Sequence, residues 1–171
     1  LRIHLNGEVT AVQISGATSL HQLQNKYNCQ VVGVDRDAKA IGVARNEAFK
    51  NVPDADFYVE DVLNTNLFET YPDNYFSHCF CISHLVHLQI GKKKDDLIAS
   101  LKRISRNVVV YERVATKDDI ATKKNRSFQD YEKEYNFHLL RHLTKQAAKK
   151  EKRIGVFYWT TEDPINAKLA D

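Results

Sequence analysis

Short apolar runs alternate with amphipathic segments along most of this chain. The clearest run is VVGVD at residues 31–35, whose valines fall on both sides of the strand pleat. A run of this kind is too short for a helix and is typical of a strand buried on both faces of a parallel sheet. Comparable patterns predict further strands at residues 9–15, 57–59, 75–83, 107–114, 137–143 and 153–160.

Apolar residues at helical spacing lie between these strands. They predict helices at residues 20–27, 38–50, 95–105 and from about 127 to 135, with short helical turns near 67–71 and 85–88. The segment joining the last two strands is too short for a crossover helix, so those strands should be antiparallel. The sequence therefore predicts an α/β fold with a mostly parallel seven-stranded sheet, helices on both faces and a final antiparallel strand pair.

Acidic residues close the second and third predicted strands. Asp35 ends the run at 31–35, and Glu60 and Asp61 follow the strand at 57–59. Because the carboxyl ends of parallel strands face one edge of a sheet, Asp35 and Asp61 should converge there. A carboxylate at that edge can accept both hydroxyls of a ribose, although Asp35 could instead cap the helix that follows it. The small-residue turn at 15–19 adds a weak signal for a nucleotide or phosphate ligand, because it has one glycine.

Composition sets the general class. A chain of 171 residues with 43% apolar content is expected to form one domain spanning residues 1–171. Neither a bilayer-spanning apolar run nor a secretion signal is seen, so the chain is expected to be soluble and cytoplasmic. Three cysteines cannot all pair, which favours reduced thiols. The chain starts at Leu1 and has no methionine, so we expect an N-terminal truncation.

The segments VVGVDRDAKAIGVAR, DADFYVEDV, FSHCFCISHLVHL and ISRNVVVYERV, in this order, resemble the Rossmann-like (class I) S-adenosylmethionine-dependent methyltransferases. The resemblance extends over residues 9–160 and implies S-adenosylmethionine as cofactor. It implies that Asp35 holds the ribose hydroxyls and that Arg36 packs on the adenine. It also implies that Asp61 accepts a hydrogen bond from the adenine amino group beside the backbone of Val62, with Glu60 as the competing assignment.

The first loop departs from the family pattern of an acid followed by three alternating glycines. Here the segment is QISGATS, residues 13–19, with serine and alanine at the glycine positions. Side chains there disfavour positive φ and can crowd the methionine part of the cofactor. Two further departures are Ser77, where an acid often opens the fourth strand, and the lack of an Asn-Pro-Pro-Tyr-like segment after it. The resemblance assigns to cofactor binding, besides the residues above, Ser15, Gly16, Ala17 and Cys81.

These observations predict a methyltransferase with a small-molecule or macromolecular acceptor. The alternative is a catalytically inactive methyltransferase-like domain that serves for binding or as a scaffold. A nicotinamide-dependent oxidoreductase is disfavoured because the Gly-x-Gly-x-x-Gly sequence is missing.

Histidines near the fourth strand suggest two other chemistries. His84 or His87 could act as a general base, although histidines at a surface or helix cap are commoner. A metal site is disfavoured because strand alternation sends Cys79 and Cys81 to one face and His78 to the other. His138 and His142 share a face without a third ligand.

Charge is distributed unevenly along the chain. Residues 1–90 carry 6 basic and 10 acidic side chains, and residues 91–171 carry 19 and 12. The basic half allows nucleic acid as a partner but does not indicate it, because no aromatic residues interleave with Lys92–Lys94 or with the basic residues at 149–153.

Overall fold

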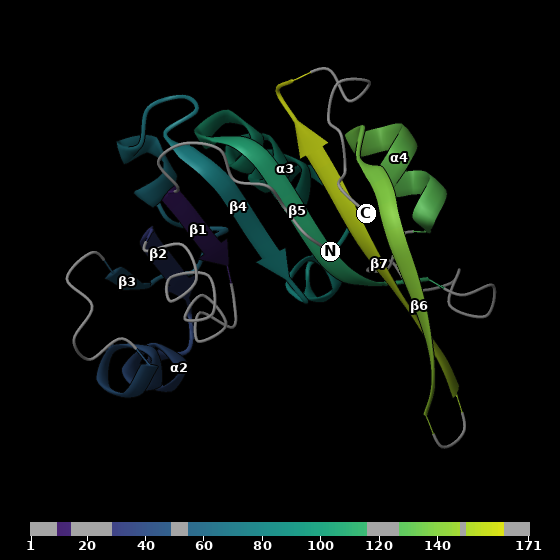
Figure 1. Cartoon of the computed structure of the whole chain (residues 1–171), viewed down its shortest axis with the longest axis horizontal. Helices are drawn as coiled ribbons and strands as arrows, with labels where there is room; N and C mark the ends of the chain where they lie inside the picture. Colours follow the sequence, from purple (N-terminus) through teal and green to yellow (C-terminus); the bar gives the residue numbers. More distant parts are fainter. Residues whose placement is uncertain (1–9, 15–28, 49–54, 116–126, 148–149, 163–171) are drawn as a thin grey trace.

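The computed structural model describes residues 10–14, 29–48, 55–115, 127–147 and 150–162. These residues build a seven-stranded sheet in the order β3-β2-β1-β4-β5-β7-β6 (Figure 1). The strands are β1 (Thr10–Ile14), β2 (Gln30–Asp35), β3 (Ala55–Val59), β4 (Phe76–Ile82), β5 (Ser105–Val114), β6 (His138–Ala147) and β7 (Lys150–Thr160). The first five are parallel, whereas β7 is antiparallel to both of its neighbours. The predicted α/β class and antiparallel closing pair are therefore confirmed, in a sheet that is mixed.

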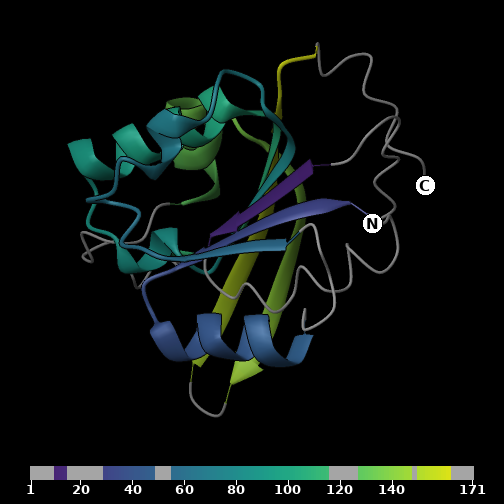
Figure 2. The same cartoon turned by 90° about the vertical axis from the view of Figure 1, so that its left-hand side faces the viewer.

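Helices lie on both sides of this sheet within the described ranges. Figure 2 shows α2 on one side and α3 and α4 on the other. The α-helices are α2 (Ala38–Val43), α3 (Lys92–Ile104) and α4 (Phe128–Tyr135), accompanied by a π-helical turn η2 (Ala44–Ala48) and 3-10 turns η3 (Leu67–Thr70) and η4 (Leu85–His87). The arrangement leaves the carboxyl ends of β1 to β4 on one edge, where the candidate site lies.

Local sequence explains the ends of α2 and α4. Asp37 caps α2 by accepting a hydrogen bond from the N–H of Lys39 at 2.9 Å. Ser127 and Asp130 form a reciprocal capping box at the start of α4, and Asn136 ends it in the left-handed conformation. Asp37, two residues after Asp35, therefore supplies the helix cap. Asp35 is not the capping residue and lies at the end of β2, at the edge of the sheet.

The core packs between the sheet and α3. Val31, Val32 and Val34 in β2 are buried on both faces, as the valine run predicts. The apolar residues expected at helical spacing in the segment 95–105 are all buried in α3: Leu97, Ile98, Leu101 and Ile104. Lys94, at the same helical spacing, is also fully buried, which the pattern of apolar residues did not predict.

Several predicted boundaries change in the structure. The helix expected at 38–50 is α-helical only to Val43, and a π-helical turn continues it to Ala48. The helix expected at 95–105 begins at Lys92, and Ser105 already belongs to β5. The strand expected at 9–15 is described at Thr10–Ile14, and the helix expected at 20–27 lies outside the described residues.

The closing strand pair is longer than predicted. The sequence places the last two strands at residues 137–143 and 153–160, but β6 and β7 are paired from His138 with Tyr158 out to Ala147 with Lys150. The tip of this ribbon extends beyond β5, whose pairing with β7 ends at Val114 and Arg153 (Figure 1). Cross-strand hydrogen bonding continues past the body of the sheet, which the turn-like composition of the segment obscures.

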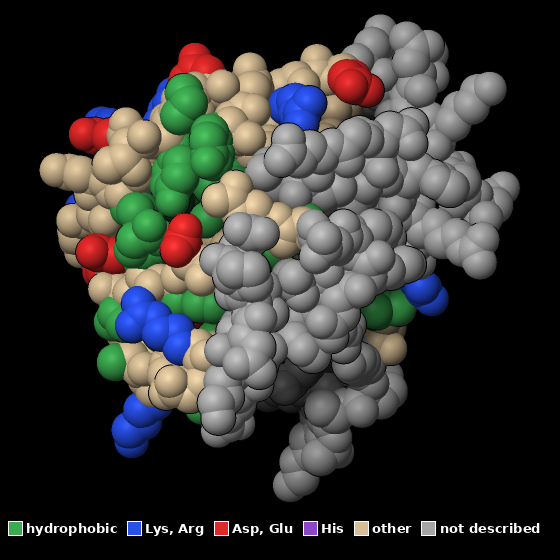
Figure 3. All heavy atoms as spheres, turned by 60° about the vertical axis from the view of Figure 1, so that its left-hand side comes forward, with side chains coloured by type: hydrophobic (Ala, Val, Ile, Leu, Met, Phe, Trp, Pro, Cys, Tyr) green, Lys and Arg blue, Asp and Glu red, His purple; other side chains and the backbone are tan. Residues whose placement is uncertain are grey.

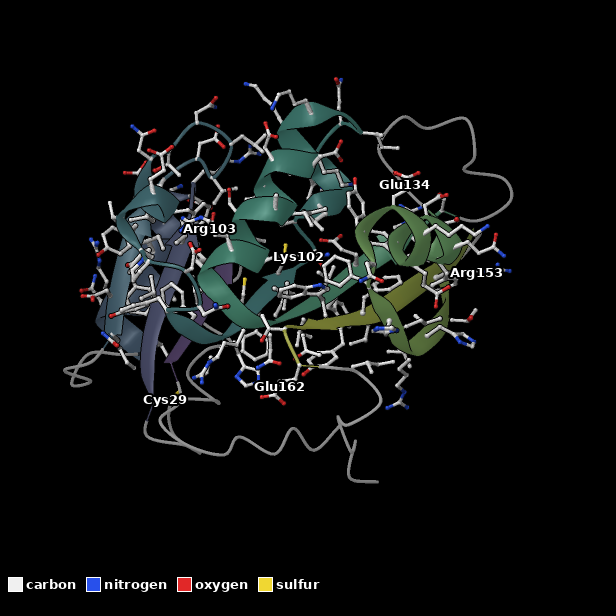
Figure 4. The ribbon with its side chains drawn as sticks, turned by 90° about the horizontal axis from the view of Figure 1, so that it is seen from above. Cys29, Lys102, Arg103, Glu134, Arg153 and Glu162 are labelled. Carbon is white, nitrogen blue, oxygen red and sulfur yellow. The ribbon has the colours of Figure 1, made fainter. Side chains whose placement is uncertain are left out.

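Two neighbouring basic residues attach α3 to different parts of the fold. Figure 4 labels Lys102 on the α4 side of α3 and Arg103 on the other. Lys102 donates to the Tyr135 carbonyl, and its Nζ lies 4.8 Å from the ring centre of Phe137. Arg103 donates to carboxylate and carbonyl oxygens of the η3 connector, on Asp73 at 2.8 Å and Phe68 at 2.7 Å.

No helix among the described residues is long and apolar enough to cross a bilayer.

Candidate functional site

Asp35 is the last residue of β2 and lies half-buried at the carboxyl edge of the sheet. Its Oδ1 accepts a hydrogen bond from the N–H of Asp37 at 2.9 Å. Its carbonyl accepts from the N–H of Glu60 at 3.1 Å, which joins the end of β2 to the end of β3. The carboxylate is thus oriented by the backbone that turns into α2.

Asp61 follows β3 by two residues and is exposed. Its Oδ1 accepts from the N–H of Leu63 at 3.0 Å, and its Oδ2 accepts from the amide of Asn64 at 2.7 Å. The Leu63 hydrogen bond contributes most to lowering the pKa of Asp61, and Asn64, Arg36 and His84 act in the same direction, while burial opposes them. Asp61 is therefore ionised at neutral pH and held in one orientation.

The two carboxylates lie in the same pocket, as the topology predicts. Its lining comes from the ends of β2 and β3 and from the turn after β4: Val34, Asp35, Arg36, Glu60, Asp61, Val62 and His84. Buried Val34 and Val62 provide the apolar part, whereas Arg36, Glu60 and Asp61 are exposed. The lining thus combines apolar side chains with acidic acceptors and a planar guanidinium, residue types that can contact an aromatic ring and accept hydrogen bonds from hydroxyl groups.

The pocket lies toward the β3 edge of the sheet. Val59, at the end of β3, is 45% exposed, as expected for an edge strand. Figure 3 turns this side of the molecule forward and shows hydrophobic side chains gathered there, with acidic and basic side chains beside them.

His84 reaches the pocket from the turn that follows β4. Ser83 has a φ of 51°, in the left-handed region, and its N–H donates to the Tyr111 carbonyl at 2.7 Å. Burial lowers the pKa of His84, and the negative charge of Asp35 is the largest opposing influence. The imidazole is therefore neutral at pH 7. The sequence identified His84 as a candidate base, and the structure places it among the pocket residues.

Two fully buried polar side chains hold this turn. Oε1 of Glu112, on β5, accepts the N–H groups of both His84 and Leu85, the latter at 2.6 Å. Nζ of Lys94, on α3, donates to the Leu85 carbonyl at 2.9 Å. Sequence reasoning did not assign a function to either residue. The available signals were a glutamate within the apolar run NVVVYERV and a lysine in register with the buried face of α3.

Of the other residues predicted to bind the cofactor, the structure describes only Cys81. Cys81 is fully buried in the core, where burial raises the pKa of its thiol, and it does not line the pocket. Ser15, Gly16 and Ala17 lie outside the described residues. His87 is exposed and is not part of the lining. In the described ranges, no three His, Cys, Asp or Glu side chains form a group that could hold a metal ion.

Comparison with known proteins was made by sequence and by fold. A family model described as "Methyltransferase domain" matches residues 9–108. No curated protein matches the chain in sequence.

Solved structures with a similar fold include methyltransferases crystallised with the cofactor or its product. Magnesium protoporphyrin IX methyltransferase from Synechocystis PCC 6803, with bound SAM, has a TM-score of 0.61 at 18% identity, covering 89% of this chain and 70% of that one. The N-methyltransferase NodS from Bradyrhizobium japonicum WM9, in complex with S-adenosylhomocysteine, has a TM-score of 0.66 at 12% identity, with coverages of 90% and 79%.

The fold is also similar to that of the [4+2]-cyclase SpnF, with a TM-score of 0.64 at 16% identity, covering 82% of this chain and 54% of that one. At these identities the structural likeness establishes the fold, while the sequence match over residues 9–108 establishes the family. The chain belongs to the methyltransferase-domain family.

Proposed function

We propose that this chain binds S-adenosylmethionine at the carboxyl ends of β2 and β3 and transfers its methyl group to an acceptor. The observation that carries the proposal is that Asp35, at the end of β2, and Asp61, just after β3, line one pocket. Membership of the methyltransferase-domain family supports it. The structures of two fold neighbours with bound SAM or S-adenosylhomocysteine agree with this choice of cofactor.

Each pocket residue receives a role from its chemistry. Asp35 accepts hydrogen bonds from the two ribose hydroxyls, because its carboxylate lies at the carboxyl end of β2 and lines the pocket. Asp61 accepts from the adenine amino group, beside the backbone of Val62. The flat guanidinium of Arg36, exposed in the pocket lining, stacks on the adenine ring. Ser15, Gly16 and Ala17 are proposed to lie near the methionine part.

The chemistry requires mainly alignment. When bound, S-adenosylmethionine would supply an electrophilic methyl group, which passes to the acceptor atom in line as the bond between the methyl carbon and sulfur breaks and S-adenosylhomocysteine is released. The residues of this chain fix the nucleoside and exclude water, which converts a reaction between two free molecules into one within a complex. A protein base is needed only for an acceptor that loses a proton. Neutral His84, which lines the pocket, is the described residue best suited to that task.

The second candidate function is binding without methyl transfer. It is favoured by the first turn, where one glycine stands among serine and alanine in the segment SGATS. A fold neighbour named as a [4+2]-cyclase illustrates that similar folds carry other activities.

We treat residues 1–171 as one domain in either case. A cytoplasmic location is proposed because Cys29, Cys79 and Cys81 are all free thiols.

Calorimetric titration of the purified protein with S-adenosylmethionine and S-adenosylhomocysteine tests the binding proposal. We expect saturation at one site and at least about tenfold weaker binding by Asp35→Ala, because hydrogen bonds to a charged acceptor contribute about 1.5–3 kcal/mol each. Asp96→Ala is the matched control, since Asp96 is exposed on α3, where it forms an ion pair with Lys92. The absence of a binding heat at millimolar concentrations of both ligands would reject the proposal.

A second assay separates transfer from binding. Protein incubated with methyl-labelled S-adenosylmethionine and cell extract should transfer label to an acceptor in an Asp35-dependent manner. One-site binding without any labelled product would instead favour the binding domain.

A further inference from the structure

One polar atom of the candidate pocket has no part in holding the nucleoside in the roles assigned above. Nε2 of His84 is buried, and no hydrogen-bond partner for it exists among the described residues. Leaving a buried polar group without a hydrogen bond costs about 1–3 kcal/mol. Such a group in a folded protein is therefore expected to have a hydrogen-bond partner, which can be a bound ligand. Because His84 lines the same pocket as Asp35, a ligand bound there can supply that partner.

The backbone holds His84 in this place through several independent contacts. Ser83 takes a left-handed φ of 51°, which a non-glycine residue adopts at a cost. Glu112 accepts the N–H groups of His84 and Leu85, and Lys94 binds the Leu85 carbonyl. Both of these anchoring side chains are fully buried. A strained residue next to two buried polar anchors indicates that the position of His84 is fixed by the fold.

His84 and Asp35 line the same pocket and interact electrostatically. Asp35 is the charged group that acts most strongly on its pKa, ahead of His87, Arg36 and Asp61, while burial as the largest influence keeps the ring neutral. A neutral imidazole nitrogen either donates or accepts, depending on the tautomer. A hydroxyl group does both, so it can satisfy Nε2 in either tautomer, whereas an amino group or a carbonyl can satisfy only one.

We propose that Nε2 of His84 hydrogen-bonds a ribose hydroxyl of the bound nucleoside, so that Asp35 and His84 hold the ribose together. Glu112 is the positioning residue that fixes His84 for this contact. This inference rests on the proposed function, and it adds a specificity determinant: the site selects a ribonucleoside over its deoxy counterpart through two side chains from different strand ends.

Two substitutions of His84 test the contact. Glutamine carries its terminal amide at about the reach of the imidazole Nε2, and asparagine carries it at the reach of Nδ1. We therefore expect His84→Gln to bind S-adenosylhomocysteine nearly as well as the unmodified protein, and His84→Asn to bind it about 3- to 10-fold more weakly, the size of one hydrogen bond. His87→Asn serves as the control, because exposed His87 does not line the pocket.

The 2′-deoxy and 3′-deoxy analogues of S-adenosylhomocysteine identify the hydroxyl. For the analogue that lacks the contacted hydroxyl, the unmodified protein and His84→Asn should bind equally, because the interaction is already absent. The inference is overturned if His84→Asn binds S-adenosylhomocysteine as the unmodified protein does, or if its loss is equal for all three ligands. If the unmodified protein binds none of them, the proposed function itself fails.

Discussion

Glu112 offers the strongest test of how the turn after β4 is held. Its side chain is fully buried, and one carboxyl oxygen accepts the N–H groups of His84 and Leu85. Alanine at this position would leave both donors without that acceptor, and each unsatisfied buried donor costs about 1–3 kcal/mol. We therefore expect Glu112→Ala to lower the free energy of unfolding by about 2–5 kcal/mol, the His84 donor being only partly buried.

Urea denaturation followed by circular dichroism at pH 7 measures this loss. Glu112→Gln keeps an oxygen that can accept both N–H groups, so a smaller loss of about 1–2 kcal/mol is expected. Glu132→Ala, at an exposed position of α4, is the matched control and should change stability by less than about 0.5 kcal/mol. A loss for Glu112→Ala no larger than that of the control would refute the reasoning.

Two further predictions concern the core. In Gly155→Ala, the new Cβ would lie 2.5 Å from Cε2 of Phe157, whose buried ring stacks on Tyr131. Urea denaturation should therefore show a free energy of unfolding lower by about 1–3 kcal/mol. An unchanged free energy of unfolding would contradict this packing. Burial, aided by the charge of Arg106, lowers the pKa of His78 from 6.5 to about 4. Between these pH values His78 binds a proton in the unfolded chain but stays neutral in the folded protein. Stability should therefore fall by up to about 3 kcal/mol as the pH drops from 6.5 to 4, and His78→Phe should show less of this decline; an identical decline would count against a neutral buried His78.

The sheet and the paired acids were predictable because they depend on local patterns and a general rule. Valines on both sides of β2 indicate a strand covered on both faces, and the parallel connection then brings Asp35 and Asp61 to the same edge. Neither step requires knowledge of distant contacts.

The anchoring of the turn was not predictable for the opposite reason. Glu112 and Lys94 act on backbone atoms of residues 84–85, which are 27 and 9 residues away from them in sequence. Nothing in a local pattern shows which buried backbone group a polar side chain will reach. The extra length of β6 and β7 was obscured in a similar way, because charged, turn-like residues there pair as strands.

The location of the nucleoside is the central claim, and amide chemical shifts measure it most directly. In ¹⁵N-labelled protein titrated with S-adenosylhomocysteine, the largest shifts should occur at the amides of Asp37, Leu63 and His84, which bond the carboxyl groups of Asp35, Asp61 and Glu112. The account would be contradicted if, at saturation, shifts occurred only in residues of α3 and α4 while these three amides did not shift.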